Sequence, residues 1–349
     1  MPALGSALVA SLSVTDAWYP RRSMIHNLKI ANYRGITSAE IPGLRQFSVI
    51  TGANNAGKTT VLEALSLFAQ VGGPNGQQSG SAYGTTLVNI LNGHRQQLGD
   101  VRRTLRRRTD APTSITCDSY EITLYPRNTN ELEIHNGITG FMIPQSGSSE
   151  MFFRSDLVTF IAAPTSPDPM TIEKSWSRAV REGYSREVLA AVKQVDPTIV
   201  NLQLVVGDYP ELYAESAEGE RITAWPVSAG GSGFKRLLAL VAQVAGAKGT
   251  ICIDDPDAFL HPKVFRQLAT LLWGLVEAGA QVVVATHNAD LIDALARDIN
   301  GAPRSEQFGV YGITRDASGV LTCVERIKGA AAQLPKRRDA IRQLLGLDN

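Results

Sequence analysis

A glycine-rich segment has the residue types and spacing that indicate chemistry most clearly. Residues 52–59 read GANNAGKT, a full match to the phosphate-binding pattern G-x-x-x-x-G-K-[ST]. Backbone N–H groups of such a loop surround the β- and γ-phosphates of a nucleotide, and glycine serves where the chain turns without a Cβ atom. Lys58 would contact the phosphate oxygens, and Thr59 would bind Mg²⁺. The pattern predicts a site for ATP with Mg²⁺.

Two further groups of polar residues follow short apolar runs. Asp254, Asp255 and Asp257 come directly after the run at 251–253, and His287 follows the run at 282–285. In a P-loop fold, an aspartate at the position of Asp254 reaches Mg²⁺ from the side opposite the loop threonine. The next carboxylate, Asp255, can orient or deprotonate an attacking water. His287 would reach the γ-phosphate from the neighbouring strand.

These groups need a scaffold, and hydrophobic patterns along the chain predict one. We expect strands at 25–30, 47–51, 251–253 and 282–285, and hairpins at 120–125 with 131–134 and at 310–314 with 320–326. Helices are expected at 57–69, 171–192, 234–247, 262–277 and 289–296. Strands that alternate with helices predict an α/β fold with a mainly parallel sheet.

Composition excludes several other classes of protein. The 349 residues are 44% apolar and carry a formal net charge of +1, which excludes whole-chain disorder. The three scattered cysteines exclude a disulfide framework and lack zinc-ligand spacing. No stretch of 18 apolar residues is present, so no membrane partner is expected. We expect a soluble cytoplasmic protein, with residues 1–23 as a loose tail.

The motifs in this order resemble the ABC-type ATPase heads of the RecF/SMC class, most closely the OLD (overcoming lysogenisation defect) group. The opening LKIANYRGI at 28–36 looks like that group's first strand and its Asn-aromatic-Arg turn. IDDPDAFLHP at 253–262 is similar to its acidic and Leu-His-Pro element, and ATHN at 285–288 to its switch histidine. SAGGSGFKR at 228–236 resembles the ABC signature. The resemblance covers residues 24–300.

The resemblance implies a P-loop NTPase of ABC-ATPase type, with an antiparallel β portion and a helical signature lobe beside the main sheet. It places one head over 24–349: a P-loop half at about 24–165, the lobe at about 166–247, the acidic and histidine half at about 248–300, and a hairpin with a basic helix at 301–349. The expected catalytic residues are Asp255 and His287, and the metal ligands Thr59 and Asp254. The expected nucleotide-binding residues are Arg34, Gly52, Asn54, Asn55, Ala56, Gly57, Lys58, Thr59, Thr60, Ser228, Gly231, Ser232 and Gly233.

Glycines at a helix N-terminus form an anion site of their own. In the ABC arrangement this signature meets the nucleotide of a second chain, so two chains packed head to tail would enclose two ATP molecules in a homodimer. Either Ser228 with Gly230, or residues 231–233, would be the contacting element. We favour 231–233, because Arg236 then falls where related chains have a basic residue.

Several features depart from the family. Asp255 replaces a usual glutamate and has a shorter reach, which predicts slow hydrolysis. Asp257 also replaces a glutamate, and the loop at 163–167 has no Q-loop glutamine. The residues after His287 lack the acidic cluster of a Toprim nuclease, so we expect an ATPase that works with a separate nuclease or toxin effector.

Arginine-rich segments at 102–108 and 336–342 leave three readings: a solvated face, a contact with DNA phosphates, or a site for an acidic protein.

Together, the motifs and the resemblance predict an ATP-driven dimeric switch in DNA repair or phage defence. A slow ATP sensor that holds an effector is the alternative, and a transporter ATPase is less favoured.

Overall fold

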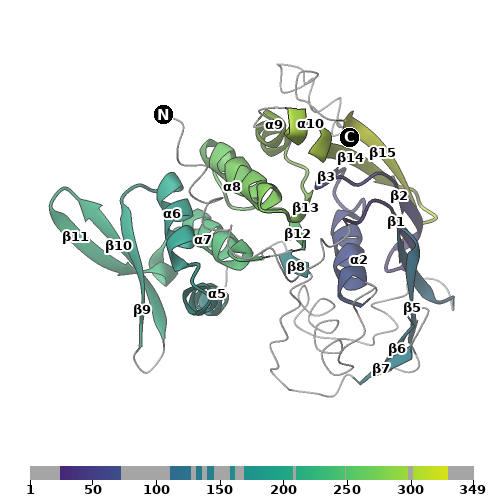
Figure 1. Cartoon of the computed structure of the whole chain (residues 1–349), viewed down its shortest axis with the longest axis horizontal. Coiled ribbons are helices and arrows are strands. Elements are labelled where there is room, and N and C mark those ends of the chain that lie inside the picture. Colours follow the sequence, from purple (N-terminus) through teal and green to yellow (C-terminus); the bar gives the residue numbers. More distant parts are fainter. Residues whose placement is uncertain are drawn as a thin grey trace.

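The structure is a computed structural model of the chain (Figure 1). It describes residues 24–71, 111–126, 131–135, 140–144, 158–161, 169–206, 210–247, 249–297 and 302–328. In these ranges, no helix is both long and apolar enough to cross a lipid bilayer.

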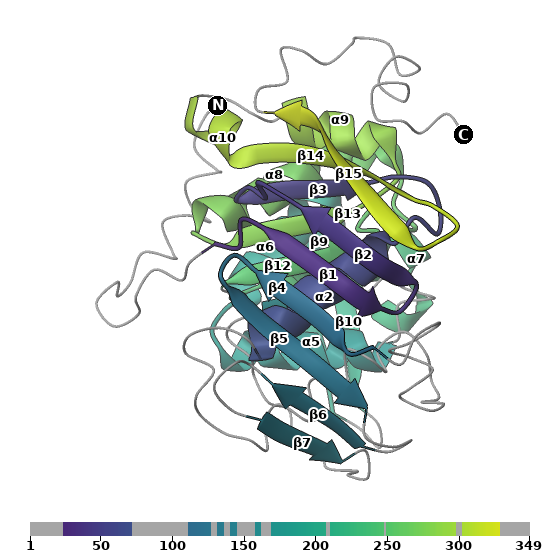
Figure 2. The ribbon, with the colours of Figure 1, turned by 90° about the vertical axis from the view of Figure 1, so that its right-hand side faces the viewer.

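Twelve strands form one curled mixed sheet, in the order β7-β6-β5-β4-β1-β2-β15-β14-β3-β13-β12-β8 (Figure 2). The strands span β1 Leu28–Tyr33, β2 Ile36–Ile41, β3 Phe47–Thr51, β4 Thr113–Cys117, β5 Tyr120–Pro126, β6 Glu131–His135, β7 Gly140–Pro144, β8 Val158–Ile161, β12 Thr250–Asp254, β13 Gln281–Ala285, β14 Phe308–Arg315 and β15 Val320–Lys328. One part of this sheet is parallel and the other is antiparallel.

The parallel part consists of β8, β12, β13, β3 and β14. Every residue of β3, β12 and β13 is buried, in keeping with the apolar residues that make up most of each strand. Parallel strands end at the same edge of a sheet. The glycine-rich loop after β3, the acidic residues after β12 and the histidine after β13 therefore share one edge.

Helices cover both faces of the parallel part (Figure 1). Helix α2 (Lys58–Val71) packs on one face, where it meets Ile50 and Val283. Helices α8 (Phe265–Glu277) and α9 (Ala289–Arg297) pack on the other face, where they meet Val49 and Val284. Alternate residues of each strand thus feed two separate hydrophobic cores.

The antiparallel part extends from β2 through β1 and β4 to β7. The C-terminal hairpin joins the two parts, because β14 pairs with β3 while β15 pairs with β2. The short helix α10 (Ala302–Gln307) precedes this hairpin.

A lobe beside the sheet has a third core, formed around Trp176, Val188 and Leu238 (Figure 1). Its helices are α5 (Pro169–Arg181), α6 (Ser185–Val195) and α7 (Ser232–Val244). A three-stranded antiparallel sheet, β11-β10-β9, lies against them. Its strands span β9 Ile199–Val205, β10 Glu211–Glu218 and β11 Arg221–Pro226, and the 3₁₀ turn η1 (Val227–Ala229) leads into α7.

The structure confirms the predicted α/β class and the strands and helices that carry the motifs. It corrects five details. The first strand begins at Leu28 rather than at residue 25, and β2 lies in a segment expected to be a link. The helix predicted at 171–192 is two helices, because the chain turns at Gly183 with φ +83°. The 3₁₀ turn η2 (Pro262–Val264) precedes α8, and the sheet β9–β11 was not predicted.

Candidate functional site

The glycine-rich loop connects β3 to α2 and turns sharply in a way that its sequence requires. Gly52, Asn55 and Gly57 all have positive φ angles, of 153°, 64° and 106°. A Cβ atom on Gly52 would lie 2.3 Å from the Ile313 carbonyl oxygen of β14, so glycine is needed there. Lys58 Nζ donates to the Gly52 and Ala53 carbonyl oxygens at 3.0 Å each. The lysine therefore lies along its own loop, at the N-terminus of a helix suited to anions.

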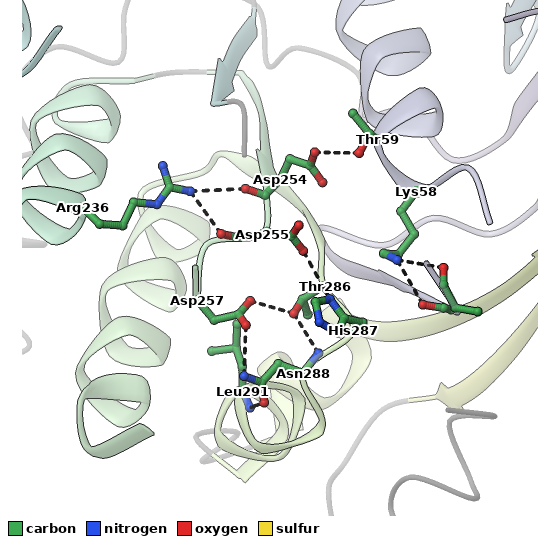
Figure 3. Close-up of polar contacts among 12 residues, drawn as sticks. Lys58, Thr59, Arg236, Asp254, Asp255, Asp257, Thr286, His287, Asn288 and Leu291 are labelled. Carbon is green, nitrogen blue, oxygen red and sulfur yellow. Dashed lines mark hydrogen bonds and ion pairs between the residues drawn. The ribbon is translucent and has the colours of Figure 1, made fainter. Parts of the chain in front are cut away.

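Thr59 and Asp254, which the sequence predicts as ligands of one Mg²⁺ ion, meet at the edge of the sheet. Thr59 Oγ1 donates to Asp254 Oδ2 at 2.7 Å (Figure 3). Asp254 is buried, and this burial raises the pKa of its carboxyl group to about 6, against the lowering effect of the Thr59 hydrogen bond. A hydroxyl and a carboxylate side by side are oxygen ligands of the kind that Mg²⁺ prefers. The pair fits a Mg²⁺ site that nucleotide phosphates would complete.

Asp255 and His287 form a second contact beside this pair. His287 Nδ1 lies 3.6 Å from Asp255 Oδ1 (Figure 3). The backbone of Asp255 has φ +40°, an uncommon conformation for a non-glycine residue, and its N–H donates to the Ala285 carbonyl at 2.9 Å. Burial raises the pKa of the Asp255 carboxyl, and the charge of Asp257 raises it further. A carboxylate whose pKa is raised in this way is suited to accept a proton from water.

Arg236 is a buried residue of α7 to which the sequence assigned no contact with the acidic edge. Its guanidinium donates to the carbonyl oxygens of Asp254 and Asp255 at 3.3 and 3.2 Å (Figure 3). Burial lowers its pKa to about 10, although the nearby aspartates favour the charged form. Arg236 thus joins the lobe helix to the end of β12. An arginine among the apolar residues of a buried helix was the signal in the sequence.

Arg34 lies in the turn after β1, with φ +52°. Its Nη1 lies 3.0 Å from Glu63 Oε2, and Glu63 is fully buried on α2, one turn beyond Thr59. The sequence predicted Arg34 as a nucleotide ligand but did not identify Glu63. The structure brings Arg34 to the P-loop helix through this ion pair.

The signature residues lie at the start of α7. Gly231 is the N-cap of this helix and is exposed, as is Ser232. Gly233 packs closely, since a Cβ there would lie 2.9 Å from the Phe259 carbonyl oxygen. Ser228 lies in η1 and donates to Glu211 on β10 at 2.7 Å. Ser228 and residues 231–232 are all exposed, so the choice of residues 231–233 as the contacting element stays a prediction.

Several predictions fall outside the described residues. They concern the tail at 1–23, the arginines at 102–108, the loop at 163–167 and the basic helix at 333–347. Of the expected nucleotide-binding set, Asn54, Asn55, Ala56 and Thr60 lie in the loop and the first turn of α2.

Two families of known proteins match successive parts of the chain. Residues 24–135 match the family described as "AAA ATPase domain". Residues 154–293 match "AAA domain, putative AbiEii toxin, Type IV TA system". The first match includes the glycine-rich loop, and the second includes the acidic residues and His287.

Solved structures identify the fold. The crystal structure of an Smc head bound to the C-terminal winged-helix domain of ScpA superimposes with a TM-score of 0.53, at 14% sequence identity. The match covers 87% of this chain and 97% of that one. The chain has the fold of an SMC-type ABC ATPase head. This confirms the predicted fold class.

Curated relatives match shorter stretches of the head. An uncharacterized protein of Methanocaldococcus jannaschii, MJECL10, is 47% identical over 45 residues, which are 13% of this chain and 20% of the relative. The cobalt import ATP-binding protein CbiO of Rhodobacter capsulatus is 41% identical over 64 residues, which are 18% of this chain and 23% of that protein. The chain thus spans about a fifth of the length of these two relatives. The resemblance to the OLD group stays a prediction.

Proposed function

We propose that this head binds ATP with Mg²⁺ and hydrolyses it, and that the nucleotide drives head-to-tail pairing of two chains. The 2.7 Å contact between Thr59 and Asp254 carries the proposal. It joins the helix that follows the glycine-rich loop to the acidic end of β12, although the two residues are far apart in the sequence. A structural turn that binds no nucleotide has no need of a buried carboxylate at that point.

Each polar group of the site has a role in this reaction. Loop N–H groups and Lys58 hold the phosphates, after Lys58 leaves the carbonyl oxygens that it now contacts. Thr59 and Asp254 would hold Mg²⁺, which when bound neutralises charge on the phosphate oxygens. Asp255 accepts a proton from the attacking water, and His287 orients the γ-phosphate beside it.

A slower variant of this function is favoured by one observation. Asp255 has one methylene fewer than glutamate, and its left-handed backbone angle fixes its direction. A misplacement of about 1 Å can cost about 100-fold in rate. The head would then act as an ATP sensor that holds a separate effector, and slow steady-state turnover with tight ATP binding would indicate this role.

Pairing of two heads is supported by the exposed start of α7. A helix N-terminus with small residues suits the γ-phosphate of a nucleotide held by another chain. Gly231 is the appropriate position for a test, because no atom lies within 4 Å of a Cβ placed there. Gly233 is unsuitable, because a side chain there would collide with the Phe259 carbonyl of the same chain.

The pairing experiment uses sedimentation velocity in the Asp255→Asn background, in which hydrolysis is blocked. ATP with Mg²⁺ should raise the dimer fraction, and Gly231→Asp should abolish that increase while leaving ATP binding intact. Identical profiles with and without ATP would exclude the nucleotide-driven dimer.

We further propose that the paired heads act on DNA or on a partner effector, in DNA repair or phage defence. The arginines at 102–108 support a DNA contact by their charge alone. The description of one matched family includes the words "putative AbiEii toxin, Type IV TA system", and one structural relative is bound to a protein partner. Fluorescence titration with duplex DNA at two salt concentrations tests the first option, since phosphate contacts lose affinity as salt rises.

The decisive experiment for the ATPase is a pair of variants. Lys58→Ala should weaken ATP binding by about 10- to 100-fold, the worth of a charge-assisted contact of about 1.5–3 kcal/mol. Asp255→Asn should bind ATP like the wild type and fail to turn it over. Hydrolysis by Asp255→Asn at the wild-type rate would contradict the assignment of Asp255.

A further inference from the structure

Asp257 lies two residues beyond Asp255, and its carboxylate contacts both neighbours of His287 (Figure 3). Thr286 Oγ1 donates to Asp257 Oδ1 at 2.7 Å. Asn288 Nδ2 donates to Asp257 Oδ2 at 3.0 Å. Each carboxylate oxygen therefore holds one residue beside the histidine.

Further hydrogen bonds fix the same loop. The hydroxyl of Thr286 accepts the backbone N–H of Asn288 at 3.0 Å, and the N–H of Thr286 donates to the Ile50 carbonyl of β3 at 3.1 Å. The side-chain oxygen of Asn288 accepts the N–H of Asp290 at 3.0 Å, which caps the start of α9. Thr286 is fully buried. The backbone on both sides of His287 is thus anchored to Asp257, to β3 and to α9.

The histidine itself is held far less firmly. Its side chain is 53% exposed, and the one polar contact recorded for it among the described residues is the 3.6 Å approach to Asp255. That distance is longer than a hydrogen bond. The place of the ring therefore depends on the backbone that carries it.

We propose that Asp257 is a positioning residue that clamps Thr286 and Asn288 and so sets the spacing between His287 and Asp255. The inference rests on the proposed ATPase function. It gives Asp257, in the loop between β12 and α8, a part in that reaction. Both Asp257 oxygens already accept hydrogen bonds from the loop, so Asp257 acts through His287 rather than on the nucleotide. Outer-shell partners of metal ligands typically change affinity or activity by about 10- to 100-fold, and we expect an effect of the same order for Asp257.

The first test uses two substitutions of nearly equal size at Thr286. Thr286→Val removes the hydroxyl and with it the hydrogen bonds to Asp257 and to Asn288. It should lower kcat for ATP about 10- to 100-fold and change KM less than about threefold, because the phosphate-binding loop is untouched. Thr286→Ser keeps the hydroxyl and should recover most of kcat. Wild-type kcat in Thr286→Val would overturn the inference.

The second test separates the clamp from the helix cap. Asn288→Asp keeps an oxygen that caps α9 but places a carboxylate against that of Asp257, and kcat should fall. Adding Asp257→Asn restores one donor and one acceptor between the two residues, and kcat should rise at least about fivefold above that of Asn288→Asp. If Asp257 had only a structural role, the single and the double variant would lose melting temperature equally, and kcat would not recover in the double variant. Additive losses in the double variant would contradict the clamp.

The third measurement needs no turnover. The His287 ring resonances are recorded by NMR in the wild type, Thr286→Val, Thr286→Ser and Asp255→Ala. Loss of the clamp should move the ring signals of Thr286→Val toward those of Asp255→Ala, while Thr286→Ser should resemble the wild type. Unchanged ring signals in Thr286→Val would refute the positioning role. If the wild type does not hydrolyse ATP but the His287 ring signals shift as expected, the ATPase function is refuted and the positioning role is not.

Discussion

Replacing Asp254 by asparagine should stabilise the protein when neither metal nor nucleotide is present. Asp254 is only 2% exposed, and burial raises its pKa from the usual 3.8 of an aspartate to about 6. Above pH 6 the folded protein must therefore carry a charge that its surroundings disfavour. This raised pKa corresponds to about 3 kcal/mol lost from the free energy of unfolding at pH 8.

Asparagine removes this cost and keeps an oxygen that accepts the Thr59 hydrogen bond. The stabilisation should depend on pH with a defined sign. At a pH between the pKa of the unfolded state and that of the folded state, Asp254 in the folded protein is already protonated. The stabilisation by asparagine should therefore fall to about half at pH 5 and vanish near pH 3. With Mg²⁺ and ATP present, the wild type should be the more stable of the two proteins, since only the wild type gains the full binding energy.

Thermal unfolding in EDTA at pH 8 and pH 5 measures the effect, with an expected rise in Tm of about 5 °C at pH 8. Asp316→Asn is the matched control. Asp316 is exposed, and hydrogen bonds from Ser318 and Val320 lower its pKa, so this change should give no gain. Equal gains at both pH values, or a loss at pH 8, would refute the electrostatic reasoning.

Three further predictions concern other parts of the site. Arg34→Ala should lower the free energy of unfolding by about 3 kcal/mol in a urea titration, because it removes the cation that lies 3.0 Å from the buried Glu63 carboxylate; adding Glu63→Leu should recover part of this loss. Gly52→Ala should abolish ATP binding in calorimetry and lower Tm, because the added Cβ would meet the Ile313 carbonyl at 2.3 Å; normal binding would show that the loop can relax. Affinity for Mg²⁺ with ATP should fall about tenfold between pH 7 and pH 5, since Asp254 must lose its proton, and a flat profile would exclude it as a ligand.

The edge of the sheet that carries the polar site residues was predictable, because each of these residues follows a short buried strand. Apolar residues make up most of β3, β12 and β13, so the ends of these strands could be located from the sequence. Parallel strands place those ends together. The sequence predicted Thr59 and Asp254 as ligands of one Mg²⁺ ion, and the structure places their side chains in direct contact at 2.7 Å. The helix α2 was visible from its apolar sequence.

The rest depended on contacts that no local pattern encodes. In strand β2, apolar and polar residues alternate only weakly. Its position is set by pairing with β1 and β15, which lie on either side of it. Strand β10 contains three glutamates, and the sheet β9–β11 lies against α6 and η1. Glu63 and Arg236 are single charged residues on buried helices, and sequence gives no direction for such side chains. Their partners, Arg34 and the carbonyls after β12, became known only from the structure.

The place of β3 in the sheet has a consequence for how the protein is made. The glycine-rich loop leaves the ribosome early, yet both strands that flank β3, namely β13 and β14, come from the last third of the chain. At about 5–20 residues per second, the nascent loop waits roughly 10–50 s for the strand that closes against Gly52. During this time ATP has no completed site and cannot assist folding. Nascent chains that stop before Arg315 should therefore fail to retain nucleotide.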